Sequence, residues 1–129
     1  MDIYDNVNQL IDKYSDSFDV CHLDDDTLTI ELLLRPLGDI ILTANIIEKT
    51  SNVDIYVDYD NLNDWDSSYT KTEYKEMFPE EHLKNTTIPK AIDIVYDTLK
   101  EWASSSFPAD AYDEVYDFLS SISELFKET

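Results

Sequence analysis

The chain has very few of the residues on which most catalytic and ligand-binding motifs depend. It contains one glycine, Gly38, and one cysteine, Cys21, in 129 residues. A Walker A loop, a dinucleotide-binding fingerprint and a glycine-rich kinase loop each need several glycines, so that the backbone can approach phosphate. A lone thiol cannot form an intrachain disulfide, which agrees with a reducing compartment. We expect Cys21 to fill space in the core rather than to act as a nucleophile.

Catalytic and metal-binding patterns are missing as well. His22 and His82 lie far apart, and the chain has no H-x-x-x-H, C-x-x-C or nucleophile-elbow pattern. With 29 acidic residues, any two carboxylates would satisfy a search for a catalytic pair, so none can be singled out. We therefore predict a protein that is not an enzyme and that has no cofactor and no dedicated metal site.

Long apolar runs are also absent. No segment approaches the roughly 18 apolar residues that a membrane-spanning helix needs, and the first residues, Met1 to Asp5, are acidic rather than basic as in a secretory signal. We expect a cytoplasmic protein. The length fits a single domain that covers residues 1–129.

What the chain has in abundance is negative charge. It carries 29 Asp and Glu against 9 Lys and Arg, for a formal net charge of -20. Self-repulsion on this scale opposes a compact state, yet 43% hydrophobic and 12% aromatic residues are typical of a folded domain. Nucleic acid and anionic membrane would be repelled. We therefore expect a basic protein as the partner, and no direct binding to nucleic acid or membrane.

Hydrophobic periodicity predicts a mixture of helices and strands. An apolar stripe predicts a helix over residues 3–14, with Asp2 as its N-cap. Alternation of apolar and polar residues predicts four strands, at residues 18–22, 27–34, 40–48 and 53–60. The strand at 40–48 carries apolar residues on both sides, so we expect it to be central. Turns are expected at Asp24–Asp26 and Arg35–Asp39.

The second half of the chain is predicted to be mainly helical. The pattern weakens between residues 60 and 88, where Thr70 and Glu73 fit a capping box for a short helix. Apolar stripes predict a helix that opens at Pro89 and a last helix over residues 109–127. The fold class is therefore α+β: an N-terminal helix, a four-stranded antiparallel sheet, a short helix, and two C-terminal helices packed on one sheet face.

The first candidate binding surface follows the fourth predicted strand into the next loop. It comprises Asp54, Tyr56, Asp58, Asp60, Asp64, Trp65 and Asp66. Carboxylates pair with Lys and Arg, and aromatic rings accept a guanidinium over their faces, so this mixture suits recognition of a basic surface. An ordinary solvent face with a polar loop remains the alternative. A calcium loop is a poor match, because Leu62 and Asn63 stand where an EF-hand needs an acid and a glycine.

The second candidate surface lies on the last helix. Its predicted contacts are Asp110, Asp113, Glu114 and Asp117, and the same acidic row continues to Glu124 and Glu128. Side chains three and four positions apart are neighbours on a helix, with Cβ atoms about 5–6 Å apart, so like charges repel one another along this row. A merely solvated helix face remains the alternative.

The order of elements and the charge resemble those of small acidic phage inhibitors that imitate nucleic acid. These are the anti-CRISPR and anti-restriction proteins, one of which also has a helix, an antiparallel sheet and two acidic helices. The comparable segments are Leu28 to Ile47 and Ile92 to Ile122. The resemblance implies a non-catalytic DNA mimic that evades host defence by occupying the nucleic-acid cleft of a nuclease, such as an RNA-guided nuclease, in the host cytoplasm.

Two other functions remain open at this point. An immunity protein that neutralises a basic nuclease toxin would use the same acidic surfaces. A secretion chaperone, which is also small, acidic and α+β, would instead bind an unfolded effector through apolar grooves. The sequence leaves open whether the protein is a monomer or a homodimer.

Overall fold

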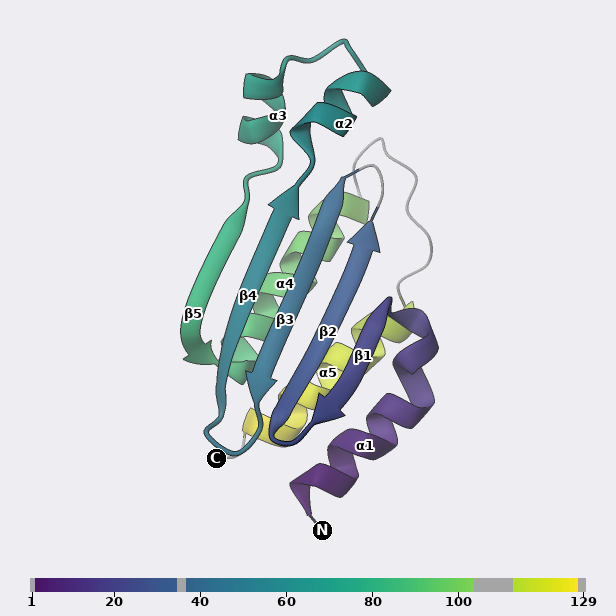
Figure 1. Cartoon of the computed structure of the whole chain (residues 1–129), viewed down its shortest axis with the longest axis vertical. Helices are drawn as coiled ribbons and strands as arrows, with labels where there is room; N and C mark the ends of the chain where they lie inside the picture. Colours follow the sequence, from purple (N-terminus) through teal and green to yellow (C-terminus); the bar gives the residue numbers. More distant parts are fainter. Residues whose placement is uncertain (1, 35–36, 104–112, 128–129) are drawn as a thin grey trace.

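The structure is a computed structural model that describes residues 2–34, 37–103 and 113–127. Its elements are α1 (Ile3–Tyr14), a short 3-10 helix (Ser15–Ser17), β1 (Val20–Asp24), β2 (Thr27–Leu34), β3 (Gly38–Asn45), β4 (Thr50–Val57), α2 (Tyr59–Trp65), α3 (Lys71–Met77), β5 (Glu81–Thr87), α4 (Ile88–Ala103) and α5 (Asp113–Lys127). The strands form one antiparallel sheet in the order β1-β2-β3-β4-β5, so each strand pairs with its neighbours in the chain (Figure 1). The strand that starts at Gly38 is central, as predicted.

The predicted α+β class is confirmed, but the predicted four strands are one too few. The strand that sequence analysis missed is β5, an edge strand that pairs with β4 alone. Only Leu83 and Thr86 within it are partly buried, so the strand shows no alternation of apolar and polar residues. Lys84 and Asn85 are also poor strand formers, and Asn85 has a positive φ of 56° beside a β-bulge.

Three elements end or begin at other residues than predicted. The first strand covers Val20–Asp24 rather than 18–22. The third stops at Asn45, because the Asn45 side chain accepts hydrogen bonds from the backbone N–H groups of Ile47 and Glu48, at 3.0 and 2.9 Å, and closes a turn. The fourth stops at Val57, and Asp58 becomes the N-cap of the unpredicted helix α2, accepting from the Asn61 N–H.

The capped helices that were predicted are present. Asp2 caps α1 by accepting from the Tyr4 N–H at 3.1 Å. Thr70 and Glu73 form the complete capping box of α3. In α5 the apolar stripe is buried, whereas residues 109–112 of the predicted helix lie outside the described part of the chain.

The helices cover one side of the sheet. α4 contacts β3, β4 and β5, while α5 packs against α4 and against α1, which lies along β1. Figure 1 shows α4 and α5 together behind the sheet, with α2 and α3 beyond its end. The side chains that face this layer are buried and form the core, and from the three middle strands they are Leu28, Ile30, Leu32, Ile40, Leu42, Ala44, Val53, Ile55 and Val57. No helix within the described ranges is both long and apolar enough to cross a membrane.

The chain's one glycine stands where β3 begins. Gly38 pairs with Val57 and has a φ of 154°. A Cβ at this position would overlap the backbone carbonyl oxygen of Tyr56. Glycine is therefore required by the close approach of two strands rather than by any ligand.

We predict that Val57→Ala destabilises the fold much more than Tyr56→Ala does. Val57 is 6% exposed, so its truncation should lower the free energy of unfolding by about 1–3 kcal/mol through lost burial and a cavity. Tyr56 is 45% exposed, so its truncation should change stability much less. Denaturant unfolding of both variants measures this. The reverse order would mean that the strand register is shifted by one residue.

Candidate partner-binding face

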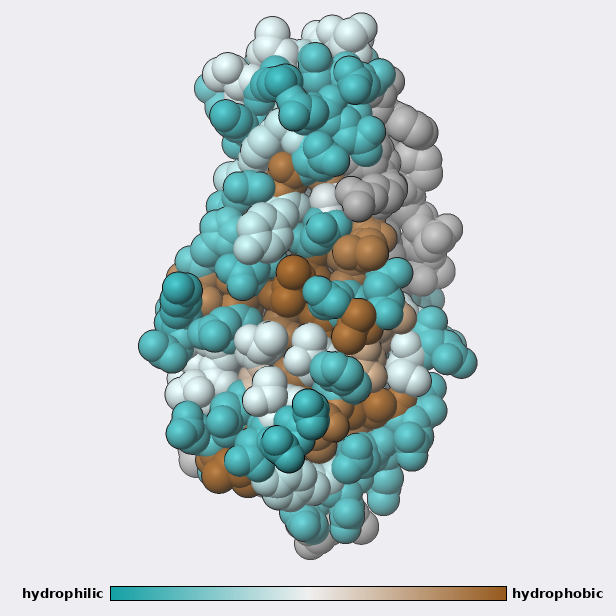
Figure 2. Space-filling model, viewed as in Figure 1, coloured by the Kyte–Doolittle hydropathy of each residue, from teal (hydrophilic) through white to brown (hydrophobic). Residues whose placement is uncertain are grey.

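One side of the sheet is not covered by any described helix. We call it the open face and define it by the outward residues Glu31, Leu33, Asp39, Ile41, Asp54, Tyr56 and His82. They alternate along the strands with the buried core positions, and Asp54 contacts His82 on the same side. Figure 2 shows this face, with apolar side chains gathered over the middle strands among hydrophilic ones. Leu33 and Tyr56 are 46% and 45% exposed, so this face presents large apolar side chains to the solvent.

Cross-strand pairing sets acids beside these apolar side chains. Ile41 lies between Glu31 and Asp54, its partners on β2 and β4. Asp39 lies in the same way between Leu33 and Tyr56. Directly opposite residues have Cβ atoms about 4.5–5.5 Å apart. The open face therefore alternates carboxylates with apolar and aromatic groups at van der Waals spacing.

Asp39 stands out because one of its carboxylate oxygens is buried. Within the described residues, Asp39 Oδ1 has no hydrogen-bond partner and almost no accessible surface. A buried acceptor without a donor destabilises a fold by about 1–3 kcal/mol, more if it is charged. The open face therefore holds a carboxylate whose interactions within the described chain are incomplete.

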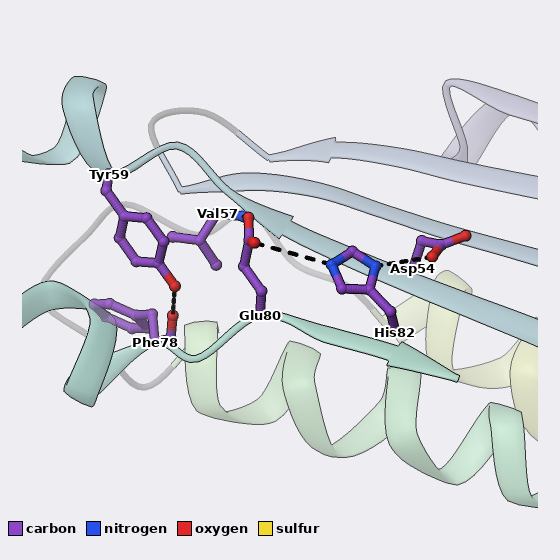
Figure 3. A network of polar contacts seen from close by, with 6 residues as sticks. All are labelled: Asp54, Val57, Tyr59, Phe78, Glu80 and His82. Carbon is purple, nitrogen blue, oxygen red and sulfur yellow. Dashed lines mark hydrogen bonds and ion pairs between the residues drawn. The ribbon is translucent and has the colours of Figure 1, made fainter. Parts of the chain in front are cut away.

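A polar network at the β4–β5 edge orients Tyr56. His82 Nδ1 lies 2.8 Å from Asp54 Oδ1, and His82 Nε2 lies 3.9 Å from Glu80 Oε1 (Figure 3). The Val57 N–H donates to Glu80 at 2.8 Å. The imidazole meets the Tyr56 ring edge to face, with ring centres 4.9 Å apart. Exposed ion pairs contribute little to stability, and within this network the contact with Tyr56 is made by the His82 ring.

The acids beyond β4 are engaged in local structure instead of forming one surface with Asp54. Asp58 is a helix cap rather than a strand residue, which corrects its predicted place on the outer strand face beside Asp54 and Tyr56. Asp60 pairs with Lys71, which lowers the pKa of the Asp60 carboxyl. Asp66 accepts from the Ser68 N–H at 2.9 Å, which lowers the pKa of Asp66.

Two further residues of the first predicted surface lie on α2. Asp64 is exposed there. Trp65 ends the helix, and its side chain lies outside the described structure. Within the described residues, no group of three or more His, Cys, Asp or Glu side chains is arranged to hold a metal ion. The acids at 58–66 thus do not converge on one point.

The acidic row on α5 lies on the other side of the molecule. Asp113, Glu114 and Asp117 are exposed, and Glu114 accepts from the Ser17 hydroxyl at 2.6 Å. Asp110 lies outside the described residues. Figure 1 shows α5 behind the sheet, and the stripe of α5 that is buried leaves these exposed acids away from the open face. One flat partner surface cannot contact both.

Cys21 faces the core rather than the solvent side of the sheet. It pairs with Ile30, whose side chain is buried, and burial raises the pKa of the Cys21 thiol to about 11. A thiol with so high a pKa is a poor nucleophile near neutral pH.

No family model, curated protein or solved structure matches this chain.

Sequence reasoning found Asp54 and Tyr56 but missed the rest of the open face. Glu31 and Asp39 stand between apolar neighbours on β2 and β3, and an acid inside an alternating strand was the signal that could have found them. Glu80 lies just before the edge strand β5 and His82 lies within it, and this segment shows no hydrophobic alternation that would predict a strand. Leu33 and Ile41 could not be told from core residues without the register.

We predict that replacing Asp39 stabilises the fold. Asp39→Thr removes the unpartnered carboxylate oxygen and one negative charge, and it adds a β-branched side chain within a strand. The free energy of unfolding should rise by about 1 kcal/mol or more. Asp12→Asn, at an exposed position on α1, is the control with the same change in charge. An equal gain in both variants would mean that net charge alone is responsible.

We also predict that Cys21 resists alkylation in the native protein. At pH 8 the rise in pKa from 9.0 to about 11 should slow the reaction with iodoacetamide about a hundredfold relative to the denatured chain, because only the thiolate reacts. The native rate should climb as the pH approaches 11. Mass spectrometry of timed reactions measures both rates, and equal rates at pH 8 would contradict the burial of this thiol.

Proposed function

We propose that the protein is a non-catalytic inhibitor that binds the basic nucleic-acid-binding surface of a nuclease. The observation that carries the proposal is the open face, where Glu31, Asp39 and Asp54 alternate with exposed apolar side chains. Arg and Lys that normally neutralise phosphate would pair with these carboxylates. The resemblance to acidic phage inhibitors of CRISPR and restriction systems agrees with this function.

The apolar part of the open face supplies contact area that a partner can bury, which charge alone does not provide. Tyr side chains are common interface anchors, exposed apolar neighbours add buried area, and the charged groups around them give specificity and fast association. Tyr56 is the best-placed anchor, since it is exposed, lies beside Asp39 and packs against His82. Its ring also offers a face to a guanidinium.

The incomplete interactions of Asp39 support the same function. A carboxylate oxygen that has no donor among the described residues would gain one when an Arg or Lys of the partner approaches. Stability given up in the free protein would then be recovered in the complex.

We predict that Tyr56→Ala weakens binding to the partner more than a change on α5 does. With the full-length protein as bait, the partner is first captured from host lysate and then titrated. Tyr56→Ala should lower the affinity by about 1–2 kcal/mol. The double variant Asp113→Asn with Asp117→Asn, on the opposite side of the molecule, should lower it less. If the α5 variant loses more affinity than Tyr56→Ala, the acidic helix is the binding surface.

The identity and salt dependence of the partner decide between functions. A nuclease whose DNA binding is displaced by the protein, with association that slows steeply as the Debye length falls from about 10 Å at 0.1 M salt to about 3 Å at 1 M, supports the proposal. A toxin nuclease inhibited in the same way would identify an immunity protein. An unfolded effector segment bound without regard to salt would identify a chaperone and contradict the proposal.

A further inference from the structure

A pocket lies between the two long helices, α4 and α5. It has a volume of about 210 Å³ and lies between the first half of α4 and the last two turns of α5. Its walls include Ile92, Asp93 and Tyr96 from α4, and Ser120, Ser123 and Glu124 from α5. This pocket is separate from the open face and was not suggested by the sequence.

Ser123 is the feature of this pocket that points to a ligand. The residue is 4% exposed, and its hydroxyl oxygen has no hydrogen-bond partner among the described residues. Buried hydroxyl groups nearly always have a partner, because an unsatisfied one destabilises the fold. A bound group that donates to Ser123 Oγ would remove this penalty.

The polar lining of the pocket consists mainly of hydrogen-bond acceptors. Asp93 and Glu124 place a carboxylate on each helix, and the hydroxyls of Ser120, Ser123 and Tyr96 can also accept. Lys127 is the cation among the lining residues, and it is an exposed side chain 4.0 Å from Glu124 at the rim. At this distance, and with both side chains mostly exposed, the pair is weak, so the carboxylates of Glu124 and Asp93 can both turn to a ligand.

The apolar part of the lining suits the stem of a long side chain. Ile92 is 2% exposed and forms an apolar wall. One face of the neighbouring Tyr96 ring is in contact with Lys100, whose Nζ lies 4.5 Å from the ring centre, and the ring also packs on Tyr116 at 4.6 Å. The Tyr96 ring is thus held by these neighbours, and it forms a wall of the pocket rather than an open surface on which a ligand could stack. A ligand here needs an aliphatic body and a head rich in donors.

We propose that this pocket binds the side chain of an arginine from a protein partner. The guanidinium carries five N–H donors in a planar fork and no acceptor, so it can donate to carboxylates on two sides and to Ser123 at once. A lysine ammonium is a compact point charge that is more strongly hydrated, and it satisfies fewer separated acceptors. The inference agrees with a basic partner but depends only on the pocket.

The test titrates the isotope-labelled full-length protein with N-acetyl-arginine amide and follows the backbone amide signals by NMR. The lysine analogue and the neutral citrulline analogue, which keeps the planar head without its charge, are titrated in parallel. We expect saturable shifts confined to residues 92–96 and 120–127, larger affinity for the arginine probe than for the lysine probe, and no saturation with citrulline.

Variants separate a built pocket from general attraction to a polyanion. Ser123→Ala and Glu124→Gln should each weaken the arginine probe about tenfold, because each removes a hydrogen bond to a charged group. Ser123→Ala should not destabilise the fold, since it removes an unpartnered hydroxyl. Asp12→Asn, on α1, should leave the affinity unchanged. Equal binding of arginine and lysine, shifts spread over all acidic surfaces, or unchanged affinity in both pocket variants would each overturn the inference.

The outcome is independent of the proposed function. The nuclease-inhibitor proposal is tested by Tyr56→Ala on the open face, whereas the arginine pocket is tested by a small probe without any partner. A pocket that fails leaves the open-face result standing, and a partner that is not a nuclease leaves the pocket standing.

Discussion

The structure depends on the burial of one side of the sheet under α4 and α5. A net charge of -20 on 129 residues opposes any compact state, and the apolar contacts of this single layer are what offset it. Val53, Ile55 and Leu42 from the strands meet Leu99, Phe118 and Ile122 in one continuous core. Because no described helix covers the other side of the sheet, the outward side chains there remain accessible among the described residues.

The same constraint explains where the acids are. Carboxylates cannot enter the core without a counter-charge, so they collect at helix ends, turns and outer surfaces. Several of them then stabilise local structure, as Asp58 does at the start of α2 and Asp60 does with Lys71. Some acids of the open face and of α5 have a local partner, as Asp54 has His82 and Glu114 has Ser17, whereas Asp39 Oδ1 has none among the described residues. The proposed function in binding positive charge would account for the acids that lack such a local role.

Much of the fold could be read from the sequence, because strong periodicity follows from strong burial. The stripe of α1, the alternation of β2 and β4, and the capping box of α3 were all predicted, and each of these elements buries one clear face. β5 was missed because it is an edge strand with only two partly buried positions, so its sequence shows no hydrophobic alternation. α2 was missed because Asp58 and Tyr59 continue the alternation of β4 for two residues after the strand has ended.

The candidate site was only partly predictable for a related reason. Sequence alternation identified Asp54 and Tyr56 as outward residues, yet their neighbours across the sheet come from register, which a single sequence does not specify. Asp39 lies beside Tyr56 only because Gly38 pairs with Val57 at a place where no Cβ fits. The chain's single glycine thus permits the close pairing that brings an acid and an aromatic ring together.

The two unpartnered polar groups in the described structure lead to the same physical conclusion. Asp39 Oδ1 is buried on the open face and Ser123 Oγ is buried between the helices, on the opposite side. Each destabilises the free protein, and an ordered water would compensate only where it could reach further polar groups. Asp39 Oδ1 is an acceptor, the Ser123 hydroxyl can accept or donate, and neither has a described Lys or Arg as a partner. A hydrogen-bond donor would satisfy either atom, and a positively charged donor would suit the Asp39 carboxylate best, which agrees with the basic partner proposed above.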